Sequence, residues 1–455
     1  MYFAIRNYAT ILRNYYHLEG QRMKKKKTLG LILTSGILAT SLAYGSTSAF
    51  ADPITTPNGP WVTDQQNLSF ASLMSNEQLE AKLKQIAQSS KGKMKLEQYG
   101  TSNDGNPLYV AKLGDNTPNK KRVLIYTQIH GNEALGTEAA VELMQKLTAG
   151  GKEADQILDK VSIWFAPRIN PDGTANQYEG KPFPTRYSHQ TWNPEELGLP
   201  AGTKAPWYYN AEGSERAQNN NGKVIYGIPG FDLNRDFHPN YDFDINEEIK
   251  KDPQKVADIL NNSDTNTGSQ ASLVFSPETR ALTNVVKEFD PDVAIDLHHR
   301  GFNQLSEEDK RSVSIQLLAL FTTKPYVDPF NGKTYKVDES VETLSKKVNA
   351  VAYESLQRGN SSFGAIQKYP QVNYPGSGLG AIQLNGTATM LIEIKGQTQT
   401  LGQKQNGMLK ETAKVPVMAV LNSLADGSIE FADPAVYDAI PDYALPVSPG
   451  DKKDN

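Results

Sequence analysis

The stretch VLIYTQIHGNE, residues 123–133, decides the fold class of this chain. Residues 123–129 form a nearly continuous apolar run, which is typical of a strand buried on both faces of a parallel sheet. Over residues 133–147 the apolar positions recur with helical spacing, and Gly150-Gly151 ends the helix. A buried strand, a short turn and a helix make a βα unit, so the sequence indicates an α/β protein.

The same alternation continues on both sides of this unit. Helices are predicted over residues 75–90, with Ser75 as the N-cap, and over 277–289. Short apolar segments predict further strands at 108–113, 161–166, 293–297 and 388–394. Asn170-Pro-Asp-Gly173 is expected to be a turn because of its residue types. The predicted fold is α/β, with a mixed, mostly parallel twisted sheet flanked by helices on both faces.

The N-terminus has the three parts of a secretory signal. Residues 24–27 are basic, residues 29–42 are apolar, and Ala49-Phe50-Ala51 fits cleavage between small residues, so residues 1–51 are predicted to be a signal peptide. The apolar part is interrupted and shorter than the about 20 residues that span a bilayer, which favours cleavage over an anchor. Met23 would begin a more conventional signal peptide. A secreted protein of a Gram-positive bacterium is expected.

The rest of the chain divides into three parts. Residues 52–74 are a Pro- and Asn-rich spacer, 75–425 are one large domain, and 426–455 are an acidic, Pro-containing tail expected at the surface or without order. Two long polar stretches, 177–230 and 325–338, are expected to be loops around a cleft.

Composition narrows the possible functions. The net charge is -4, without an excess of basic residues, so no nucleic-acid partner is expected. The chain contains no cysteine, which excludes a disulfide framework, a cysteine-ligated metal and a thiol nucleophile. Histidines and carboxylates remain as possible metal ligands. A monomer without stable membrane insertion is expected.

Two histidines stand at the ends of predicted buried strands. His130 and Glu133 can face one ion if the chain turns between them at Gly131, and His298 ends the strand that begins at residue 293. Functional residues of open α/β sheets gather beyond the carboxyl ends of the strands, so we expect these three side chains to meet. Two histidines and one glutamate leave a fourth tetrahedral position for water, which is the arrangement of a catalytic zinc, one per chain.

His299 competes with His298 for the role of ligand. Neighbouring residues on a strand face opposite sides of the sheet, so only one of the two can ligate. We expect that residue to be His298, with His299 in the packing or at the rim of the cleft.

Glu393 lies within a predicted apolar strand, where burial of an unpaired carboxylate is costly. It therefore needs a partner or a chemical task. As a general base it would take a proton from a water molecule that the metal activates, and return it to a leaving amine. The alternative is an ion pair with Lys395, which shares one face of the strand with Glu393. The predicted metal ligands favour the catalytic role.

The run FDLNRDF, residues 231–237, offers groups that suit an anion. Arg235 can hold a carboxylate by two parallel hydrogen bonds, and the Asn234 amide can donate another. Asp232 can accept from the second nitrogen of a metal-binding histidine and so orient the ring. The alternative for this run is an ordinary ion-paired loop.

Together these segments resemble the zinc carboxypeptidase family that includes carboxypeptidase A. The resemblance covers about residues 75–425 and rests on the order of several short motifs, which is much more specific than any one of them. The motifs are HGNE at 130–133, NPDG at 170–173, DLNR at 232–235, PET at 277–279, DLH at 296–298 and the strand that carries Glu393. The resemblance implies a catalytic domain over residues 75–425 that hydrolyses the C-terminal bond of peptides and proteins.

The resemblance also implies roles for single residues. Asn234 and Arg235 would bind the terminal carboxylate of the substrate. A further arginine, with Arg186 the first candidate and Arg216 the second, would polarise the scissile carbonyl. The spacer 52–74 is too short to be the folded inhibitory prosegment of digestive relatives.

Two features bear on substrate specificity. A mobile tyrosine that closes on the substrate is expected to be Tyr374 or Tyr369. Residues 376–386, which help to line the specificity pocket in the family, contain Gln383 and Asn385 but no charged residue. A strong preference for a charged terminal residue is therefore not implied.

Two other functions compete with this interpretation. The first is an enzyme of the same fold that hydrolyses another amide, either N-acyl amino acids or the peptide stems of peptidoglycan. The second is a secreted binding protein without catalysis, which the complete set of candidate catalytic residues argues against.

Overall fold

A computed structural model describes most of the chain from residue 73 onward. It describes residues 73–443 apart from positions 179, 213–216, 219–223, 226–227, 263–271, 301–304, 307, 310, 312, 358–362 and 396–401, together with 55–56 and 59–60. All of these belong to one compact unit that begins at Pro53. The predicted signal peptide, residues 1–51, and most of the spacer lie outside the described residues.

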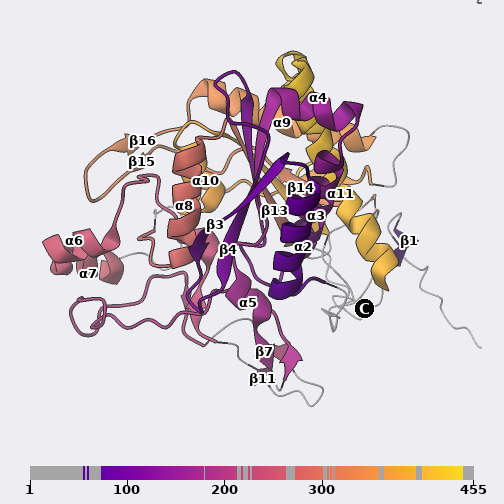
Figure 1. Cartoon of the computed structure of the whole chain (residues 1–455). Coiled ribbons are helices and arrows are strands. Elements are labelled where there is room, and N and C mark those ends of the chain that lie inside the picture. The colour runs from indigo at the N-terminus through magenta and orange to yellow at the C-terminus, as the bar shows by residue number, and fades with distance from the viewer. Residues whose placement is uncertain are drawn as a thin grey trace, which may run out of the picture. The chain divides into compact units, whose positions relative to one another are not determined.

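An eight-stranded sheet forms the centre of this unit (Figure 1). Its strands are β3 (Met94–Thr101), β4 (Pro107–Leu113), β5 (Lys121–Thr127), β6 (Val161–Ala166), β13 (Val293–Arg300), β14 (Ile315–Leu318), β17 (Ile366–Lys368) and β18 (Ala388–Lys395). The order across the sheet is β17-β14-β18-β13-β5-β6-β4-β3. The four central strands, β18 to β6, are parallel, and antiparallel pairs lie between β14 and β18 and among β6, β4 and β3. The predicted mixed, mostly parallel sheet is confirmed.

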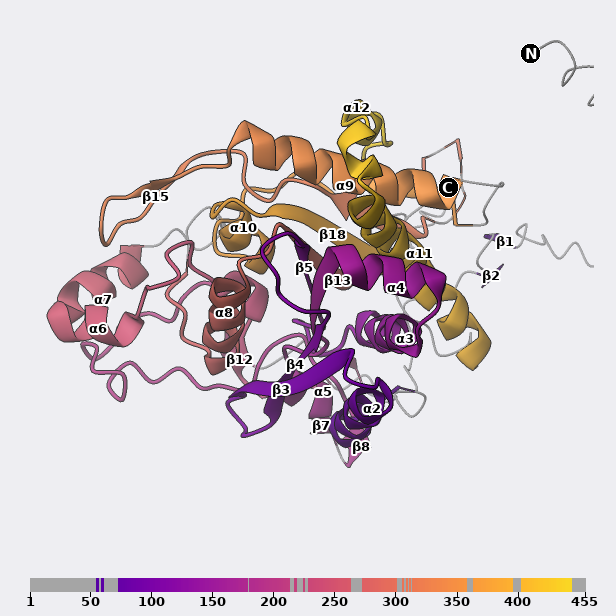
Figure 2. The same cartoon turned by 45° about the horizontal axis from the view of Figure 1, so that its top comes forward.

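Helices cover both faces of the sheet (Figure 2). The helices are α2 (Asn76–Ser89), α3 (Leu135–Ala149), α4 (Lys152–Lys160), α5 (Pro171–Ala175), α6 (Ile245–Lys251), α7 (Pro253–Asn262), α8 (Pro277–Phe289), α9 (Glu339–Gln357), α10 (Gly378–Gln383), α11 (Gly402–Asp426) and α12 (Ala435–Asp438). Helices α2, α3, α4, α9 and α11 pack on one face, and α8 and α10 on the other. Along β5, Val123 and Ile125 point into the first core and Leu124 and Tyr126 into the second. A strand buried on both faces explains the continuous apolar run.

Most of the predicted elements are found close to their expected bounds. The strand at 161–166 and the helix at 277–289 have the predicted ends, and Ser75 caps α2 by accepting from the backbone of Gln78. One expectation is wrong in detail: Asn170-Pro-Asp-Gly173 starts the short helix α5 rather than a turn, because the Asn170 side chain accepts from Gly173 N and caps it.

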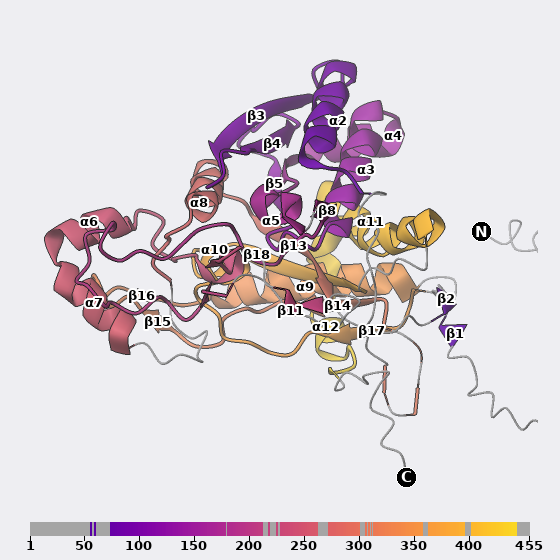
Figure 3. The ribbon, with the colours of Figure 1, turned by 90° about the horizontal axis from the view of Figure 1, so that it is seen from below.

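The predicted loop regions contain short two-stranded antiparallel sheets. They are β7 (Gln177–Tyr178) with β8 (Lys181–Pro182), β9 (Tyr209–Asn210) with β12 (Gly230–Phe231), β10 (Ala217–Gln218) with β11 (Val224–Ile225), and β15 (Tyr326–Val327) with β16 (Thr334–Tyr335). A separate pair, β1 (Thr55–Thr56) and β2 (Gly59–Pro60), lies in the spacer. In Figure 1, α5, which follows β6, lies below the sheet, so the view from below in Figure 3 faces the carboxyl ends of the central strands.

The packed domain extends beyond residue 425, where the sequence analysis ended it. Ile429, Tyr437 and Ile440 are buried in the same core as α9 and α11, and the backbone N–H of Ala319 donates to the Tyr437 hydroxyl at 3.1 Å. These apolar side chains fix the first part of the acidic segment to the domain up to Tyr443. Within the described residues, none of the helices has the length and apolarity that crossing a membrane requires.

Candidate metal centre

The carboxyl ends of three neighbouring central strands bring the predicted ligands and Glu393 together. His130 follows β5, and His298 lies near the end of β13, where it is in register with Glu393 on the neighbouring strand β18. Thr127, the last residue of β5, is in register with Leu297 on the other side. His130 and His298 are therefore neighbours, although 168 positions separate them in the sequence.

Glu133 lies between the two imidazole rings. Its Oε1 is 2.8 Å from His130 Nδ1 and its Oε2 is 2.8 Å from His298 Nδ1, and the two Nδ1 atoms are 3.2 Å apart. Zinc–nitrogen bonds of about 2.0–2.1 Å at a tetrahedral angle place two ligand nitrogens about 3.3 Å apart. Among the described residues this is the one group of three such side chains whose ligand atoms lie within 4.8 Å of one another. The donor set and its spacing fit a zinc ion.

Each histidine has a carboxylate behind it. His130 Nε2 lies 3.2 Å from Asp232 Oδ1, and His298 Nε2 lies 2.7 Å from Asp296 Oδ2. Each Nε2 can therefore keep its proton, which leaves the Nδ1 lone pair to face the centre. Asp232 stands where the sequence analysis expected it. The contact of Asp296 was missed, although a residue two positions before His298 on a strand shares its face.

The carboxylates and imidazoles shift one another's pKa values. Burial raises the pKa of Glu133, but the charges of His130 and His298 hold it well below the ordinary value. Burial lowers the pKa of His298, but Asp296 and Glu133 raise it well above its ordinary value. The pocket is thus built from strongly interacting groups, as metal and catalytic sites are.

His299 does not join the cluster. Its Nε2 accepts from the backbone N–H of Leu135 at 2.8 Å, at the start of α3, and its own backbone N–H donates to Glu133 Oε2 at 3.0 Å. Burial lowers the pKa of His299 to about 4, in keeping with a neutral ring that accepts. His299 therefore packs beside the cluster and contacts both Glu133 and the start of α3, the helix that follows it.

The NPDG motif holds Arg186 in place. Asn170 Nδ2 donates to the backbone carbonyl of Arg186 at 3.1 Å. The Arg186 guanidinium in turn donates to Asp232 Oδ2 from Nε at 3.0 Å and from Nη2 at 2.9 Å, while its Nη1 is 3.2 Å from His130 Nδ1. One carboxylate thus orients both a candidate ligand and a guanidinium beside it. Arg216, the second candidate, lies outside the described residues.

Glu393 is buried beside the three candidate ligands, with 9% of its surface exposed. Burial raises its pKa to about 8; Glu133 adds to the rise, whereas His298, Arg300 and Arg186 oppose it. The groups that shift this pKa most are therefore those of the candidate metal centre and the two arginines beside it.

A cleft of about 410 Å³ opens above this cluster. It is lined by His130, Glu133, Arg186, Asn234, Arg235, His298, His299, Arg300, Phe321, Tyr369, Val372, Tyr374, Leu391 and Glu393. All the candidate substrate-binding residues of the sequence analysis are therefore in one cavity. Arg300 was missed because the predicted strand ended at residue 297, whereas β13 continues through Arg300.

The candidate anion-binding pair has two different environments. The guanidinium of Arg235 lies over the Tyr374 ring at 4.4 Å from its centroid and donates to the Asn234 carbonyl at 2.7 Å. The amide of Asn234 already has close neighbours, because its Oδ1 accepts from Gly378 N at 3.0 Å and its Nδ2 lies 3.2 Å from His298 Nε2. Arg235 is therefore the more available of the two to a ligand.

Gln383 and Asn385, in the expected specificity region, make hydrogen bonds that stabilise the fold. The Gln383 amide bonds to the backbone of Phe321 and Ala319, at 2.9 and 2.8 Å, and Asn385 Nδ2 donates to Ala381 O at 2.9 Å. Neither residue lines the cleft.

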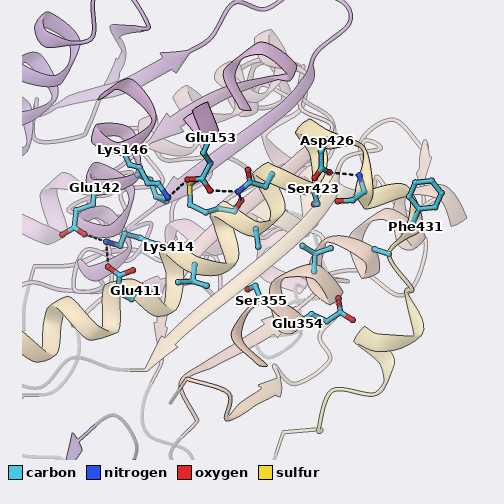
Figure 4. Close-up of a pocket in the computed structure, with 18 residues that line it drawn as sticks. Glu142, Lys146, Glu153, Glu354, Ser355, Glu411, Lys414, Ser423, Asp426 and Phe431 are labelled. Atoms are coloured by element: carbon cyan, nitrogen blue, oxygen red, sulfur yellow. Dashed lines mark hydrogen bonds and ion pairs between the residues drawn. The ribbon is translucent and has the colours of Figure 1, made fainter. Parts of the chain in front are cut away.

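A larger hollow lies elsewhere on the domain (Figure 4). Its volume is about 660 Å³, and it is bounded by α3, α4, α9, α11 and the segment around Phe431. Figure 4 shows ion pairs along its wall, such as Lys146 with Glu153 at 2.9 Å and Lys414 with Glu142. It contains no histidine and none of the predicted site residues, so size alone does not mark the functional site.

Comparison with known proteins agrees with this geometry. The sequence profile of the family described as zinc carboxypeptidase matches residues 79–317, more than half of the chain. A carboxypeptidase E of Caenorhabditis elegans is 32% identical over 123 residues, which are 25% of this chain and 26% of that protein. A zinc carboxypeptidase of Saccharothrix mutabilis subsp. capreolus is 30% identical over 86 residues, 18% of this chain and 20% of that protein. The chain thus spans about a quarter or less of these relatives' lengths.

The solved structure of thrombin activatable fibrinolysis inhibitor has a similar fold. Its TM-score is 0.51 over 83% of each chain, and its sequence identity is 14%. The profile match contains His130, Glu133 and His298 but ends before Glu393. The place of Glu393 at the centre therefore comes from the register of β18 with β13.

Proposed function

The chain belongs to the zinc carboxypeptidase family, and on that premise we propose that it is a zinc metallocarboxypeptidase that removes the C-terminal residue of peptides and proteins. The observation that carries the proposal is the convergence of His130, Glu133 and His298 with Glu393 in one cleft. One zinc ion per chain is the cofactor. When bound, zinc supplies a Lewis acid that activates water and polarises a carbonyl oxygen.

Glu393 is proposed to be the general base and acid. Its carboxyl takes a proton from the attacking water and passes it to the nitrogen of the leaving amine. Without the charge of a metal ion its pKa is about 8, and a divalent ion held by His130, Glu133 and His298 would lower it toward the range in which the carboxylate is ionised at neutral pH. Burial thus keeps Glu393 basic enough to accept a proton, and the ion keeps it ionised.

Arg186 is proposed to stabilise the negative charge that develops on the scissile carbonyl oxygen. Its guanidinium borders the cleft beside His130, and Asp232 fixes it through two hydrogen bonds. Donors that are held in place before the reaction are effective because they need no reorganisation when charge develops.

Arg235 is proposed to bind the terminal carboxylate and so to make the enzyme an exopeptidase. The Tyr374 ring covers one face of its guanidinium, which leaves the N–H donors at its edge for a carboxylate. Asn234 borders the same place and supports it, and Tyr374 and Tyr369 are the candidates for closure over the substrate. Secretion and action as a monomer outside the cell are part of the proposal, supported by the signal-like sequence of residues 24–51.

A substrate panel tests the proposed function. Purified protein is incubated with free peptides, N-acyl amino acids and muropeptides, and timed mass spectra follow the products. Stepwise loss of C-terminal residues from free peptides, stopped by a chelator and restored by zinc, is expected. Cleavage of only the acyl amino acids or only the muropeptides would replace the proposal by an amidohydrolase, and no cleavage with no bound zinc would remove it.

Glu393→Gln is the first variant to test. The amide keeps the size of the side chain but cannot accept the proton, so kcat/KM should fall by about 10³-fold or more, while zinc content measured by atomic spectroscopy stays at one per chain. Glu288→Gln, at an exposed residue that pairs with Lys112, is the matched control. Unchanged activity of the Glu393 variant would remove this residue from the mechanism.

A further inference from the structure

Arg300 is held between two tyrosine rings at the border of the cleft. Its guanidinium lies 5.1 Å from the centroid of the Tyr369 ring and 4.5 Å from that of Tyr443. Tyr443 belongs to the segment that follows α12, and this segment is fixed beside Tyr369 because Lys368 N donates to Pro441 O at 2.8 Å. Stacking on two aromatic faces positions a guanidinium and leaves its edge, where the N–H donors lie, open.

No carboxylate forms an ion pair with Arg300 in the part of the chain that the structure describes, although the charge of Arg300 lowers the pKa of Glu393. Arg186, in contrast, is paired with Asp232 at 2.9 Å, and Arg235 has the proposed task of holding the terminal carboxylate. Arg300 shares the face of β13 that His298 occupies, two residues earlier, and it lines the same cleft. The cleft therefore contains one oriented cation more than the proposed reaction uses.

Arg300 and Arg235 stand at opposite ends of one wall of the cleft. Residues 369–374 form this wall alongside β14 and the residues that follow it, since Tyr369 N donates to Leu317 O and Tyr374 N donates to Phe321 O, both at 2.8 Å. Arg300 stacks on the first tyrosine of the wall and Arg235 on the last. Tyr374 is five residues after Tyr369, so the two ends of the wall are at most about 17 Å apart, and the side chains of the two arginines and of the substrate span part of this distance.

We propose that Arg300, between Tyr369 and Tyr443, is a specificity-determining residue that binds a carboxylate side chain of the substrate on the acyl side of the scissile bond. The inference rests on the proposed function, because the terminal carboxylate at Arg235 sets the direction of the peptide. With that end fixed, a Glu or Asp one or two residues before the terminal residue reaches Arg300. The substrate class is thus peptides with an acidic residue close to, but not at, the C-terminus.

The test compares peptides that differ only by Glu or Gln. The terminal residue is kept constant, and Glu or Gln is placed at the penultimate or the preceding position. The wild-type protein should cleave a Glu peptide with kcat/KM about tenfold or more above that of its Gln counterpart, the range expected of a charge-assisted bidentate pair. Arg300→Gln should reduce the Glu/Gln ratio to about one, whatever its effect on the rate with Gln peptides, and Arg300→Lys should restore part of the ratio.

Two controls separate a contact from a structural effect. Arg280→Gln changes an arginine that pairs with Asp244 outside the cleft, and the Glu/Gln ratio should stay at the wild-type value. Tyr443→Ala removes one of the two stacking rings and should reduce the ratio without affecting zinc content.

Binding of the same peptides to Glu393→Gln protein, measured by calorimetry, gives a readout that does not need turnover. Hydrolysis with equal rates for Glu and Gln peptides, or a ratio that survives in Arg300→Gln, would overturn the role of Arg300 and leave the carboxypeptidase function intact. Selective binding of Glu peptides without any hydrolysis by the wild type would overturn the proposed function and support the Arg300 site. If the wild type does not hydrolyse the peptides and the Glu peptides are not bound selectively, both proposals are overturned.

Discussion

His298 and His299 are adjacent, yet the alternation of β13 gives them different tasks. His298 faces Glu133 and His130, whereas His299 accepts from the backbone of Leu135 at the start of α3. The same alternation places Asp296 on the side of His298, where its carboxylate reaches Nε2 at 2.7 Å. One strand thus supplies a candidate ligand, the residue whose carboxylate contacts its second nitrogen and, further along, Arg300.

Asp296→Asn tests the orienting contact. An amide at this position cannot hold the Nε2 proton as a carboxylate does, so zinc affinity should fall by about 10–100-fold. Competition with a chromogenic chelator measures this change. Asp290→Asn, at an exposed residue that pairs with Arg122, is the control and should bind zinc like the wild type. If both variants retain wild-type affinity, Asp296 has no part in metal binding.

Because the carboxyl of Glu278, in the PET motif, is buried, we expect the stability of the protein to depend on pH. The Glu278 side chain is fully buried, Oε1 accepts from Asn103 N at 3.0 Å, and burial raises its pKa to about 8. The folded state therefore keeps a proton that the unfolded state loses near pH 4.5. The contribution of Glu278 is most favourable below pH 4.5, and it declines as the pH rises to about 8, above which both states are ionised.

Glu278→Gln should remove this decline. The difference between the free energies of unfolding of the variant and the wild type should increase in favour of the variant from pH 5 to pH 9, by up to about 4 kcal/mol. Denaturant unfolding at several pH values measures the difference. In Glu80→Gln, where the hydrogen bond with Lys84 lowers the pKa of an exposed carboxyl, the difference from the wild type should be constant over this range. A constant difference for Glu278→Gln as well would contradict the assignment.

At the scale of elements, the connection between β5 and α3 is packed closely against neighbouring backbone. A Cβ at Gly131 would lie 2.4 Å from the backbone carbon of Gly173 and 2.6 Å from the Thr185 carbonyl oxygen. The turn between His130 and Glu133 thus packs directly on α5 and on the segment that carries Arg186. The close approach explains why a glycine separates two candidate ligands.

Gly131→Ala should displace this connection. Because the obstacles are backbone atoms, the turn has to shift, and a displacement of about 1 Å at a catalytic group can reduce the rate by about 100-fold. Zinc content and kcat/KM should both fall. Gly407→Ala, in α11, meets no atom within 4 Å and should stabilise the helix by about 0.5–1 kcal/mol without loss of activity. Full zinc content and activity in Gly131→Ala would refute this account.

At the scale of the whole molecule, the chain beyond α11 is part of the domain. Ile429, Tyr437 and Ile440 fill the core beside α9, and the burial of three such side chains contributes roughly 5 kcal/mol. That amount is comparable with the total stability of a typical domain, about 5–15 kcal/mol. Tyr443, in the same segment, stacks on Arg300, so this segment both stabilises the fold and borders the cleft.

Truncation separates the two possible ends of the domain. A chain that ends at Ala425 should be largely unfolded or have a much lower Tm, because its core is open. A chain that ends at Tyr443 should keep the wild-type Tm in a thermal scan. Equal Tm values for the two truncated chains would show that the segment contributes nothing to stability.

The sequence by itself determined the features that depend on neighbours in the chain. The continuous apolar run at 123–129 predicted a strand buried on both faces, and helical spacing with Pro277 at the first position predicted α8. His130 and His298 could be proposed as partners because both follow such strands, and the carboxyl ends of parallel strands meet at one edge. The fold class and the three candidate ligands were accessible for this reason.

Only the tertiary structure decided the features that depend on contacts between distant segments. The edge strand β3 has mostly exposed positions, and β17 has only three residues, so neither has a strong pattern of its own. The contact of Asp296 with His298 Nε2, the anchoring of Arg186 by Asn170 and the stacking of Tyr443 on Arg300 require distances that no local periodicity contains. Local patterns determine which strands and helices form, whereas packing determines which side chains meet.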